Sequence, residues 1–398
     1  MSKTYKVKPG DTYSTIARAE FGSESAANTI AQMNPGVYTL VPFSSIQIPA
    51  TGQSSRNFRP FGLDLRVNEK EIATIDSFTG SASLAGFRRF NFEIPNEVTT
   101  RLICKQFKPS PVDIGYNGFP MLAGYLGSAQ PVKSENKKTL KIEAYSNPTV
   151  ISSPMLADSF PLEFEKQNLD VITGTLLKPY TVEYEFVGEI GPVFSKIKIK
   201  QKQNTYEFLS GLSKQRALVI GDDGDGKMLY NNGMGYGEPV LKIDAEKRPD
   251  CSVSVQCSPE DMFSSVTGIL RGKRGKLRKK ITIINPHYSG IIRPHEFEVS
   301  ECDAGEMETA VNSVMARTFG AAFRLNVTIA GWLDKFGELL QPGAAISVKS
   351  PSDYINDFFD FLISDVTWAD TGSVKTTTMS CVIPGVYAGV IPEVVPWT

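Results

Sequence analysis

Short runs of alternating apolar and polar residues constrain the fold of this 398-residue chain more than any other feature of its sequence. Side chains of a β-strand point alternately to the two faces of a sheet, so such runs predict strands that are buried on one side. Predicted strands cover residues 63–67, 90–94, 140–144, 181–186, 196–200, 324–329, 345–348, 361–366 and 376–382. Turn residues separate them, which favours barrels or sandwiches over parallel α/β layers. We therefore expect a multidomain, mainly β protein with α+β parts.

The length and the charge of the chain set limits on its class. At 398 residues one hydrophobic core is not enough, and two to four domains are expected. The 42 basic and 43 acidic side chains nearly cancel, so no field of one sign recruits nucleic acid or a membrane surface. No apolar run approaches the roughly 20 residues that a membrane-spanning helix needs. The first residues lack the apolar core of a signal peptide, so we expect folding in a cytoplasm.

Two predicted helices interrupt the strands. The first covers residues 205–212 with Thr205 near its start, and the second covers residues 304–317 with Asp303 as its cap. The apolar face of the second helix consists of Met307, Val311, Val314 and Met315.

An acidic, glycine-rich turn at residues 222–226 follows a predicted strand at 217–220 and has the composition of a hairpin turn. It is similar to a calcium loop in composition only. An EF-hand loop that began at Asp222 would need ligands where Gly224 and Gly233 stand. We therefore predict a solvated hairpin turn without a metal ion.

The cysteines and histidines offer little to catalysis or metal binding. The five cysteines are Cys104, Cys251, Cys257, Cys302 and Cys381. They are scattered without a Cys-x-x-Cys pair, which predicts reduced, partly buried thiols. His287 and His295 each follow a proline and belong to no catalytic motif. A glycosidase needs only two carboxylates, but no acidic residue here stands in a recognisable motif. We predict no catalytic residue, no metal and no cofactor.

Seven of the ten residues from 271 to 280 are basic. They are Arg271, Lys273, Arg274, Lys276, Arg278, Lys279 and Lys280. Such a run can bind phosphate backbones, but no aromatic residues are interleaved with it for base stacking. We favour an exposed loop that docks on an acidic surface of a neighbouring subunit and sets its register.

The C-terminal residues 386–398 are apolar and rich in proline. An exposed apolar tail is a liability unless something covers it. Two interpretations are open at this stage: a partner protein covers the tail, or the tail folds back onto its own body.

Residues 5–49 form a pattern of their own. A strand, a tight turn at Gly10-Asp11-Thr12, two short helices that end near Asn34-Pro35 and a return strand are predicted there. The pattern resembles a LysM domain, a βααβ module that in many proteins binds N-acetylglucosamine polymers such as peptidoglycan. The resemblance implies that Gly10, Asp11, Thr12, Asn34 and Pro35 lie in the candidate ligand loops. The chain departs from that family at Pro42-Phe43, where Pro-Gly is usual.

Three blocks of the remaining sequence, at residues 63–95, 206–229 and 308–387, share an order and spacing with a known family. The last block includes Val327-Thr328-Ile329-Ala330-Gly331-Trp332 and closes with Val382-Ile383-Pro384-Gly385-Val386-Tyr387. The blocks resemble the baseplate hub proteins of contractile-tailed, Mu-type phages. That resemblance implies two tube-like β-barrels per subunit and a homotrimeric ring, whose six barrels match a six-fold tail tube. The LysM-like module is an addition to the family pattern.

The resemblances divide the chain into five segments. These are a LysM-like module (1–50), a linker (51–58), a first tube-like β-barrel domain (59–160), an α+β middle domain (161–235) and a second tube-like β-barrel region (236–398). The implied function is that of a structural virion protein, a trimeric hub that connects the six-fold tail tube to the three-fold central spike.

The implied partners follow from this function. They are further copies of the chain, the tail tube or tube-initiator protein, the central spike protein, other baseplate proteins, the tape measure protein and peptidoglycan. Such a protein would assemble in the host cytoplasm and reside in the tail baseplate of the virion. The rival hypotheses are a LysM-targeted protein that binds or hydrolyses cell walls, and a spike-complex protein of a type VI-like secretion device.

Overall fold

The computed structural model describes most of the chain outside its N-terminal region. The described residues are 2–6, 12, 16, 45–49, 58–59, 62–104, 108–134, 137–153, 163–200, 203–234, 238–271, 276–299 and 306–397. Strands dominate these residues and helices are few, which confirms the expected mainly β class. None of the helices in these ranges has the length and apolar character needed to cross a membrane.

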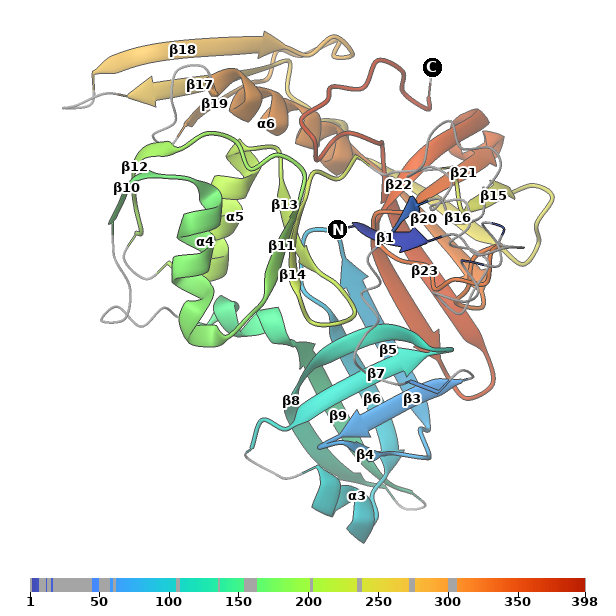
Figure 1. The fold of residues 1–398 in the computed structure, drawn as a ribbon. Coiled ribbons are helices and arrows are strands. Elements are labelled where there is room, and N and C mark those ends of the chain that lie inside the picture. Colours follow the sequence, from blue (N-terminus) through green and yellow to red (C-terminus); the bar gives the residue numbers. More distant parts are fainter. Residues whose placement is uncertain are drawn as a thin grey trace.

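A 13-stranded sheet forms the body of the molecule (Figure 1). Its first part contains β3 (Leu63–Val67), β4 (Lys70–Glu71), β5 (Ser77–Ser83), β6 (Arg89–Pro95), β7 (Pro111–Tyr116), β8 (Phe119–Lys133) and β9 (Lys138–Ser146). Its second part contains β15 (Leu241–Asp244), β16 (Ser252–Cys257), β20 (Phe323–Ala330), β21 (Ala345–Ser350), β22 (Ile355–Asp370) and β23 (Lys375–Val382). The order is β16-β20-β23-β22-β5-β6-β9-β8-β7-β3-β4, with β21 beside β22 and β15 beside β21. The strands predicted for these two parts all lie within observed strands.

The two parts of the sheet are joined where β5 pairs with the second half of β22 over six residue pairs. Aromatic side chains pack beneath this seam on the buried face. The ring centroids of Phe78 and Trp332 are 5.2 Å apart, and those of Phe90 and Trp368 are 6.1 Å apart. One hydrophobic core therefore extends through both parts of the sheet.

The segment between the two sheet parts has a core of its own, which includes Leu176, Leu209 and Tyr230. Its strands are β10 (Glu163–Gln167), β11 (Tyr184–Val187), β12 (Phe194–Lys198), β13 (Val219–Asp222) and β14 (Met228–Asn231). Its helices are α4 (Leu169–Leu177) and α5 (Thr205–Gln215), with the 3₁₀ helices η1 (Asn147–Ser152) and η3 (Lys178–Tyr180) beside them. The predicted hairpin is confirmed, because β13 and β14 pair antiparallel.

Local capping and turn residues set the ends of these elements. The Asn204 side chain accepts a 2.7 Å hydrogen bond from the Glu207 backbone N–H, so it caps α5 and Thr205 is the first helical residue. The strand predicted from residue 181 begins only at Tyr184, because Thr181 adopts a left-handed φ of 53° after a 3₁₀ helix. The pattern of alternating apolar and polar residues did not predict helix α4. The Asn168 side chain caps the first turn of this helix.

A smaller layer lies at the top of the molecule in Figure 1. It contains β17 (Ser265–Arg271), β18 (Leu277–Ile284) and β19 (Pro294–Glu298) in the order β18-β17-β19. Helix α6 (Met307–Ala322) packs on one face through Val311 and Met315, which contact Val266 of β17. The helix predicted at 304–317 is present, but it begins and ends later, at Met307 and Ala322. Its C-terminal extension includes the buried residues Phe319 and Ala322. Asp303 lies outside the described residues.

The two ends of the chain differ in how much is described. Near the N-terminus, β1 (Ser2–Lys6) and β2 (Ser45–Pro49) pair antiparallel. At the C-terminus the tail folds back onto the body, since the Trp397 ring lies 5.1 Å from Phe323 and Val395 is buried. The remaining short elements are α3 (Val98–Ile103), η4 (Pro259–Asp261) and η6 (Pro351–Asp353).

The acidic turn between β13 and β14 is not solvated, so that prediction was wrong. Asp222 is buried, and the turn packs against the start of β8. A Cβ atom on Gly224 would lie 2.1 Å from the Pro120 carbonyl oxygen. Glycine is therefore required for close approach of two backbones, and the turn fills the junction between the middle segment and the sheet.

We expect Gly224→Ala to lower the free energy of unfolding by roughly 1–3 kcal/mol, because the methyl group must displace the backbone of β8. Gly211→Ala is the matched control, since Gly211 is exposed in α5 and a Cβ atom added there would meet no neighbour within 4 Å. That control should raise stability by roughly 0.5–1 kcal/mol. Urea unfolding of both variants tests the difference, and equal effects would contradict the close packing.

Candidate functional site

One face of the main sheet is polar across eight consecutive antiparallel strands, in the order β16-β20-β23-β22-β5-β6-β9-β8. Alternation along each strand produces this face. In β6, Phe90, Phe92 and Ile94 are buried in the core, whereas Arg89 and Asn91 are exposed on the opposite side. The polar face therefore spans both parts of the sheet and crosses the seam between β5 and β22.

The register aligns the polar residues of neighbouring strands in rows. One row consists of Ser252, Thr328, Thr378, Thr367, Ser81, Arg89 and Tyr145. The next consists of Ala330, Thr376, Ala369, Thr79, Asn91, Glu143 and Ser128. Hydroxyl groups bond across the strands, with 3.0 Å between the Oγ1 atoms of Thr328 and Thr378. The surface is thus rich in hydroxyl groups whose hydrogen bonds are partly satisfied within the sheet.

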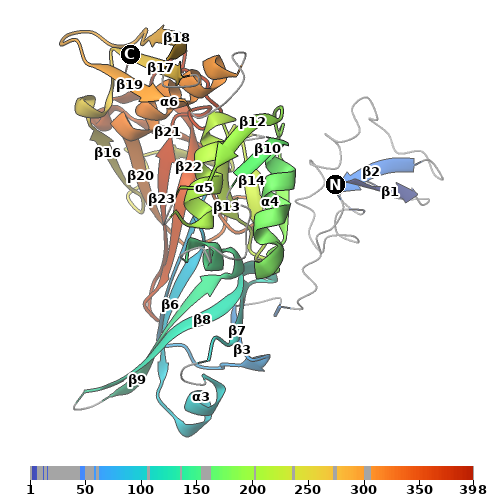
Figure 2. The same ribbon diagram turned by 90° about the vertical axis from the view of Figure 1, so that its left-hand side faces the viewer.

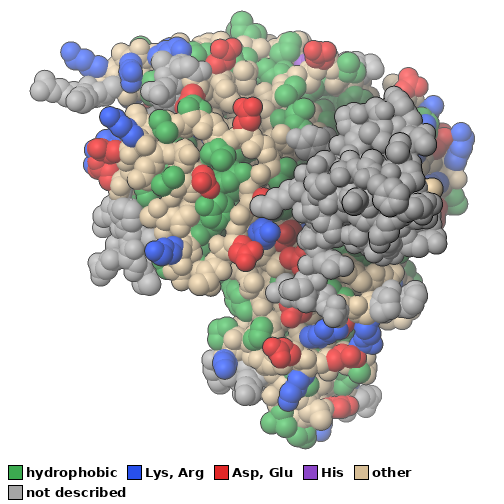
Figure 3. Space-filling model, in the orientation of Figure 1, with side chains coloured by type: hydrophobic (Ala, Val, Ile, Leu, Met, Phe, Trp, Pro, Cys, Tyr) green, Lys and Arg blue, Asp and Glu red, His purple; other side chains and the backbone are tan. Residues whose placement is uncertain are grey.

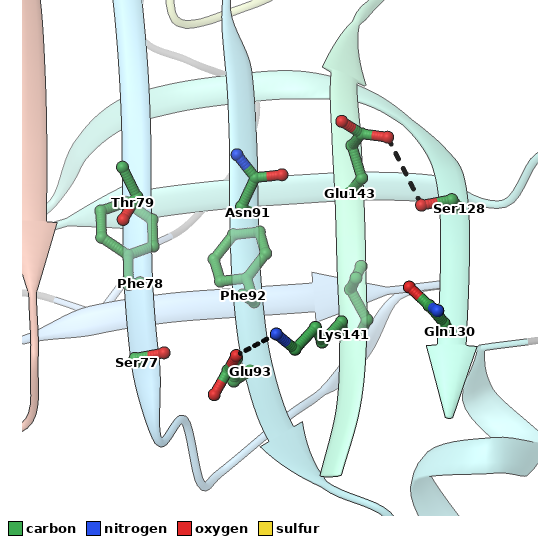
Figure 4. Close-up of a pocket in the computed structure, with 11 residues that line it drawn as sticks. Ser77, Phe78, Thr79, Asn91, Phe92, Glu93, Ser128, Gln130, Lys141 and Glu143 are labelled. Carbon is green, nitrogen blue, oxygen red and sulfur yellow. Dashed lines mark hydrogen bonds and ion pairs between the residues drawn. The ribbon is translucent and has the colours of Figure 1, made fainter. Parts of the chain in front are cut away.

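A shallow hollow of about 410 Å³ lies on this face over β5, β6, β9 and β8 (Figure 4). Its polar lining residues are Ser77, Thr79, Asn91, Glu93, Ser128, Gln130, Lys141 and Glu143. Lys141 Nζ lies 3.0 Å from a Glu93 carboxylate oxygen, and Arg89 forms an ion pair with Glu143. These charges are neutralised in pairs, so the face presents hydroxyl and amide groups rather than a field of one sign.

The two histidines and Cys104 contact neighbouring parts of the fold. No cluster of three or more His, Cys, Asp or Glu side chains suited to a metal ion occurs among the described residues. His287 Nε2 lies 2.6 Å from the Pro392 carbonyl oxygen, and His295 stacks on Phe263 with 4.6 Å between ring centroids. Burial raises the pKa of the Cys104 thiol to about 11, which keeps it protonated.

A buried ion pair holds the middle segment to the sheet. The Arg88 backbone N–H donates to Asp222 Oδ2 at 3.0 Å, and Arg88 Nε lies 3.4 Å from Asp222 Oδ1. The same guanidinium donates to the Met121 carbonyl oxygen at 2.9 Å and to Gln341 Oε1 at 2.8 Å. Arg88, at the start of β6, therefore joins three other parts of the chain: the end of β13, the first residues of β8 and the loop before β21.

Burial governs the ionisation of this pair. It raises the pKa of Asp222 to about 6, against the opposing attraction of Arg88, and it lowers the pKa of Arg88. It also raises the pKa of Asp223 in the same turn. The attraction between the two charges thus offsets only part of the free-energy cost of removing them from water. The pair fixes the geometry of the junction more than it adds stability.

Two further arginines, the buried Arg216 and the half-buried Arg317, connect the middle segment to α6. Arg216 forms an ion pair with Glu306 just before α6, and its guanidinium lies 4.3 Å from the centroid of the Phe194 ring. Arg317 of α6 donates to the Leu218 carbonyl oxygen at 3.2 Å. Together with Arg88, these side chains attach the middle segment to both of its neighbours.

Little can be placed of the site predicted from the LysM resemblance. Gly10, Asp11, Asn34 and Pro35 lie outside the described residues. Thr12 is exposed, and its carbonyl oxygen accepts a 2.9 Å hydrogen bond from the Ile16 backbone N–H. The buried Arg88 and Arg216 and the half-buried Arg317 were not predicted at all, because a single arginine in a sequence carries no sign of its burial.

The predicted basic loop is mostly a strand hairpin. Arg271 ends β17, and Arg278, Lys279 and Lys280 belong to β18, with Lys276 directly before it. Lys273 and Arg274 lie outside the described residues. Lys280 Nζ lies 3.3 Å from a Glu296 carboxylate oxygen of β19. Figure 3 shows Lys and Arg side chains gathered at the upper left of the molecule, where Figure 1 places this hairpin.

Comparison with known proteins assigns the middle segment to a family domain. Residues 156–231 match the family described as baseplate hub protein gp44-like, second domain. No curated protein sequence matches the chain.

The fold as a whole is similar to solved structures of phage tail proteins. A 43 kDa tail protein of prophage MuSo2 from Shewanella oneidensis has a TM-score of 0.68 and 17% identity, over 82% of this chain and 99% of that one. A tail protein from Neisseria meningitidis MC58 has a TM-score of 0.69 and 16% identity, over 83% and 98%. A component of the type VI secretion system of E. coli has a TM-score of 0.52 and 12% identity, over 83% and 80%.

The matched domain and the shared fold define the class of the chain: a structural protein of the contractile phage tail. Its middle segment matches the second domain of gp44-like baseplate hub proteins, which supports a role in the tail baseplate, and its fold is also that of a type VI secretion component. The resemblance to hub proteins is confirmed to this extent.

The Asp222 junction predicts a pH dependence of stability. The pKa of about 6 in the folded state lies above the usual 3.8, so the folded chain binds more protons between these values. Asp222 therefore contributes on the order of 1–3 kcal/mol to the free energy of unfolding below about pH 4. This contribution is lost as the pH rises through 6. Asp222→Asn should remove that slope.

Urea unfolding between pH 4 and pH 7 measures this slope as the difference between wild type and Asp222→Asn. Asp261→Asn, at an exposed aspartate, controls for the loss of one carboxylate. If the free energies of unfolding of wild type and Asp222→Asn differ by the same amount at every pH in this range, the raised pKa of Asp222 is contradicted.

Proposed function

We propose that the chain is the trimeric baseplate hub that connects the six-fold tail tube to the three-fold central spike. One observation carries the proposal: the eight-stranded polar face has an open strand edge at each end. Among the described residues, β16 pairs only with β20, and β8 beyond Leu126 pairs only with β9. Open edges invite pairing with another chain, and a closed ring satisfies them.

The direction of the strands supports closure into a ring. Every neighbouring pair in the stretch is antiparallel, and the number of strands is even, so β16 and β8 run in opposite directions. Rotation about an axis roughly along the strands keeps these directions. The β8 edge of one subunit then meets the β16 edge of the next in an antiparallel sense, and three copies of eight strands close the sheet.

The seam at β5 and β22 explains how a three-fold ring can meet a six-fold tube. It divides the stretch into two sets of four strands, β16-β20-β23-β22 and β5-β6-β9-β8. Three subunits therefore present six similar sets. In this proposal the sets are the tube-like barrels of regions 59–160 and 236–398, and the middle domain packs against one side of the sheet (Figure 2).

The polar face suits the wall of a channel. Its opposite face is buried in the core, so the polar face is the one that a ring can turn inward. Hydroxyl groups and neutralised ion pairs exchange hydrogen bonds with water readily and hold no polymer tightly. A tape measure protein or DNA can therefore pass such a wall. The remaining partners in this proposal are the tube or tube-initiator protein, the spike protein and other baseplate proteins.

We further propose that residues 1–50 form a LysM-like module on a linker at 51–58. The antiparallel pairing of β1 with β2 supports it, because the two strands of a βααβ module pair in this way. In this proposal Gly10, Asp11, Thr12, Asn34 and Pro35 line its ligand groove. The ligand is peptidoglycan, met while the tail penetrates the cell wall.

The ring predicts a native mass of three times 43.6 kDa, with loss of the trimer on disruption of β16. Neighbouring residues of a strand direct their N–H groups to opposite edges, so Ser254→Pro and Val255→Pro remove different hydrogen bonds. The variant that loses the N–H on the open edge should keep its melting temperature and become monomeric. The other should melt at a lower temperature.

Native mass spectrometry and particle imaging test this prediction, with circular dichroism to follow the fold. A wild-type chain that stays monomeric in the presence of spike protein would rule out the hub. A folded proline variant at each position that remains trimeric would rule out β16 as the ring edge.

The module predicts binding to insoluble peptidoglycan. Full-length wild-type protein should co-sediment with it, and Asp11→Ala combined with Thr12→Ala should weaken binding by about tenfold through lost hydrogen bonds. Lys178→Ala, at an exposed position of the middle domain, is the control and should bind as wild type. If the wild type does not co-sediment, the module has no wall ligand.

A further inference from the structure

Arg271 at the end of β17, Lys276 and residues 277–280 of β18 form a basic arm. In Figure 1, β17 and β18 lie at the upper left. Among the described residues β18 pairs only with β17, so its outer edge is open. Lys276 and Arg278 are exposed and have no ion-pair partner among the described residues. The arm thus presents unsatisfied positive charge on an open strand edge.

The first half of β22 is an acidic counterpart on the same chain. Residues 350–374 contain five aspartates and no lysine or arginine. Two of them, Asp357 and Asp360, are exposed and have no ion-pair partner within the described part of the chain. Tyr354 and Phe358 beside them are 67% and 42% exposed. We call Tyr354, Asp357, Phe358 and Asp360 the acidic patch.

The acidic patch also lies on an open strand edge. β22 pairs with β21 along its first half, whereas its pairing with β23 begins only at Leu362. One edge of the strand before Leu362 therefore has no neighbour among the described strands. Like the arm, the patch combines charge with unpaired backbone groups.

The charge balance of the chain links the two features. The net charge is −1 although the sequence from residue 271 to 280 contributes +7, so the rest of the chain carries −8. Yet the arm and the patch lie far apart within one molecule. Figure 1 places β18 at the upper left and β21, which neighbours the patch, at the upper right. Contact between them requires two copies of the chain.

We propose that the basic arm of each subunit docks on the acidic patch of the next subunit in the ring. The inference rests on the trimer proposed above, because a rotation that places copies side by side brings the left side of one to the right side of the next. Opposite charges then steer the subunits and fix their register. The guanidinium of Arg278 can also lie over an exposed Tyr354 ring, a favoured cation–π arrangement.

Charge reversal tests the docking in the full chain. Lys276→Glu with Arg278→Glu reverses the arm, and Asp357→Lys with Asp360→Lys reverses the patch. Each pair should raise the protein concentration at which half of the trimer dissociates by on the order of tenfold or more. The four changes together should restore assembly, because the charges are exchanged. Lys178→Glu with Lys200→Glu makes the same change in charge on the middle segment and should leave assembly unaltered.

Sedimentation velocity over a range of concentrations, at low and high salt, measures these effects, and thermal melts verify that each variant is folded. A wild-type trimer that is insensitive to arm reversal overturns the docking and leaves the ring intact. If charge reversal dissociates the trimer and the four changes together do not restore it, the acidic patch is not the surface on which the arm docks. A wild-type monomer overturns the ring as well. If reversal of the arm charges weakens binding of the chain to DNA and leaves the trimer intact, the arm binds nucleic acid and the docking is overturned as well.

Discussion

The pairing of β5 with β22 is the contact on which the rest of the molecule depends. It unites strands from the two ends of the body into one sheet, and it places Phe78 and Phe90 against Trp332 and Trp368 in one core. Without it the polar face would be two separate strips. Because the seam is a continuous antiparallel ladder, the two halves are fixed in register as well as in position.

The middle segment is held to this sheet by few but specific contacts. Arg88 satisfies acceptors from three parts of the chain, and Gly224 allows the backbone of the acidic turn to touch that of β8. Buried charges and close backbone contacts tolerate little displacement. Such a junction transmits force between the middle segment and the sheet without slack, as the connector proposed above would require.

The sequence predicted strands better than it predicted their partners. Alternation identified β3, β6 and β20, because burial on one face leaves a period of two. It could not show that β5 meets β22, since register between distant strands has no local signal. The rows of threonine and serine were visible in part at 376–380, but their alignment across strands follows from that register. The acidic turn was misread for a related reason: its composition suits solvent, and only the tertiary fold buries it.

The long stretch of chain between β5 and β22 has a consequence for biosynthesis. A ribosome releases β5 and its neighbours long before the strand that completes their sheet, so the edge of Ser77–Ser83 stays unpaired until β22 has been translated. Contacts of such long sequence separation form slowly. Nascent chains are then exposed to pairing with one another. Synthesis at low density, or a chaperone that shields this edge, would favour a high yield of correctly folded monomers.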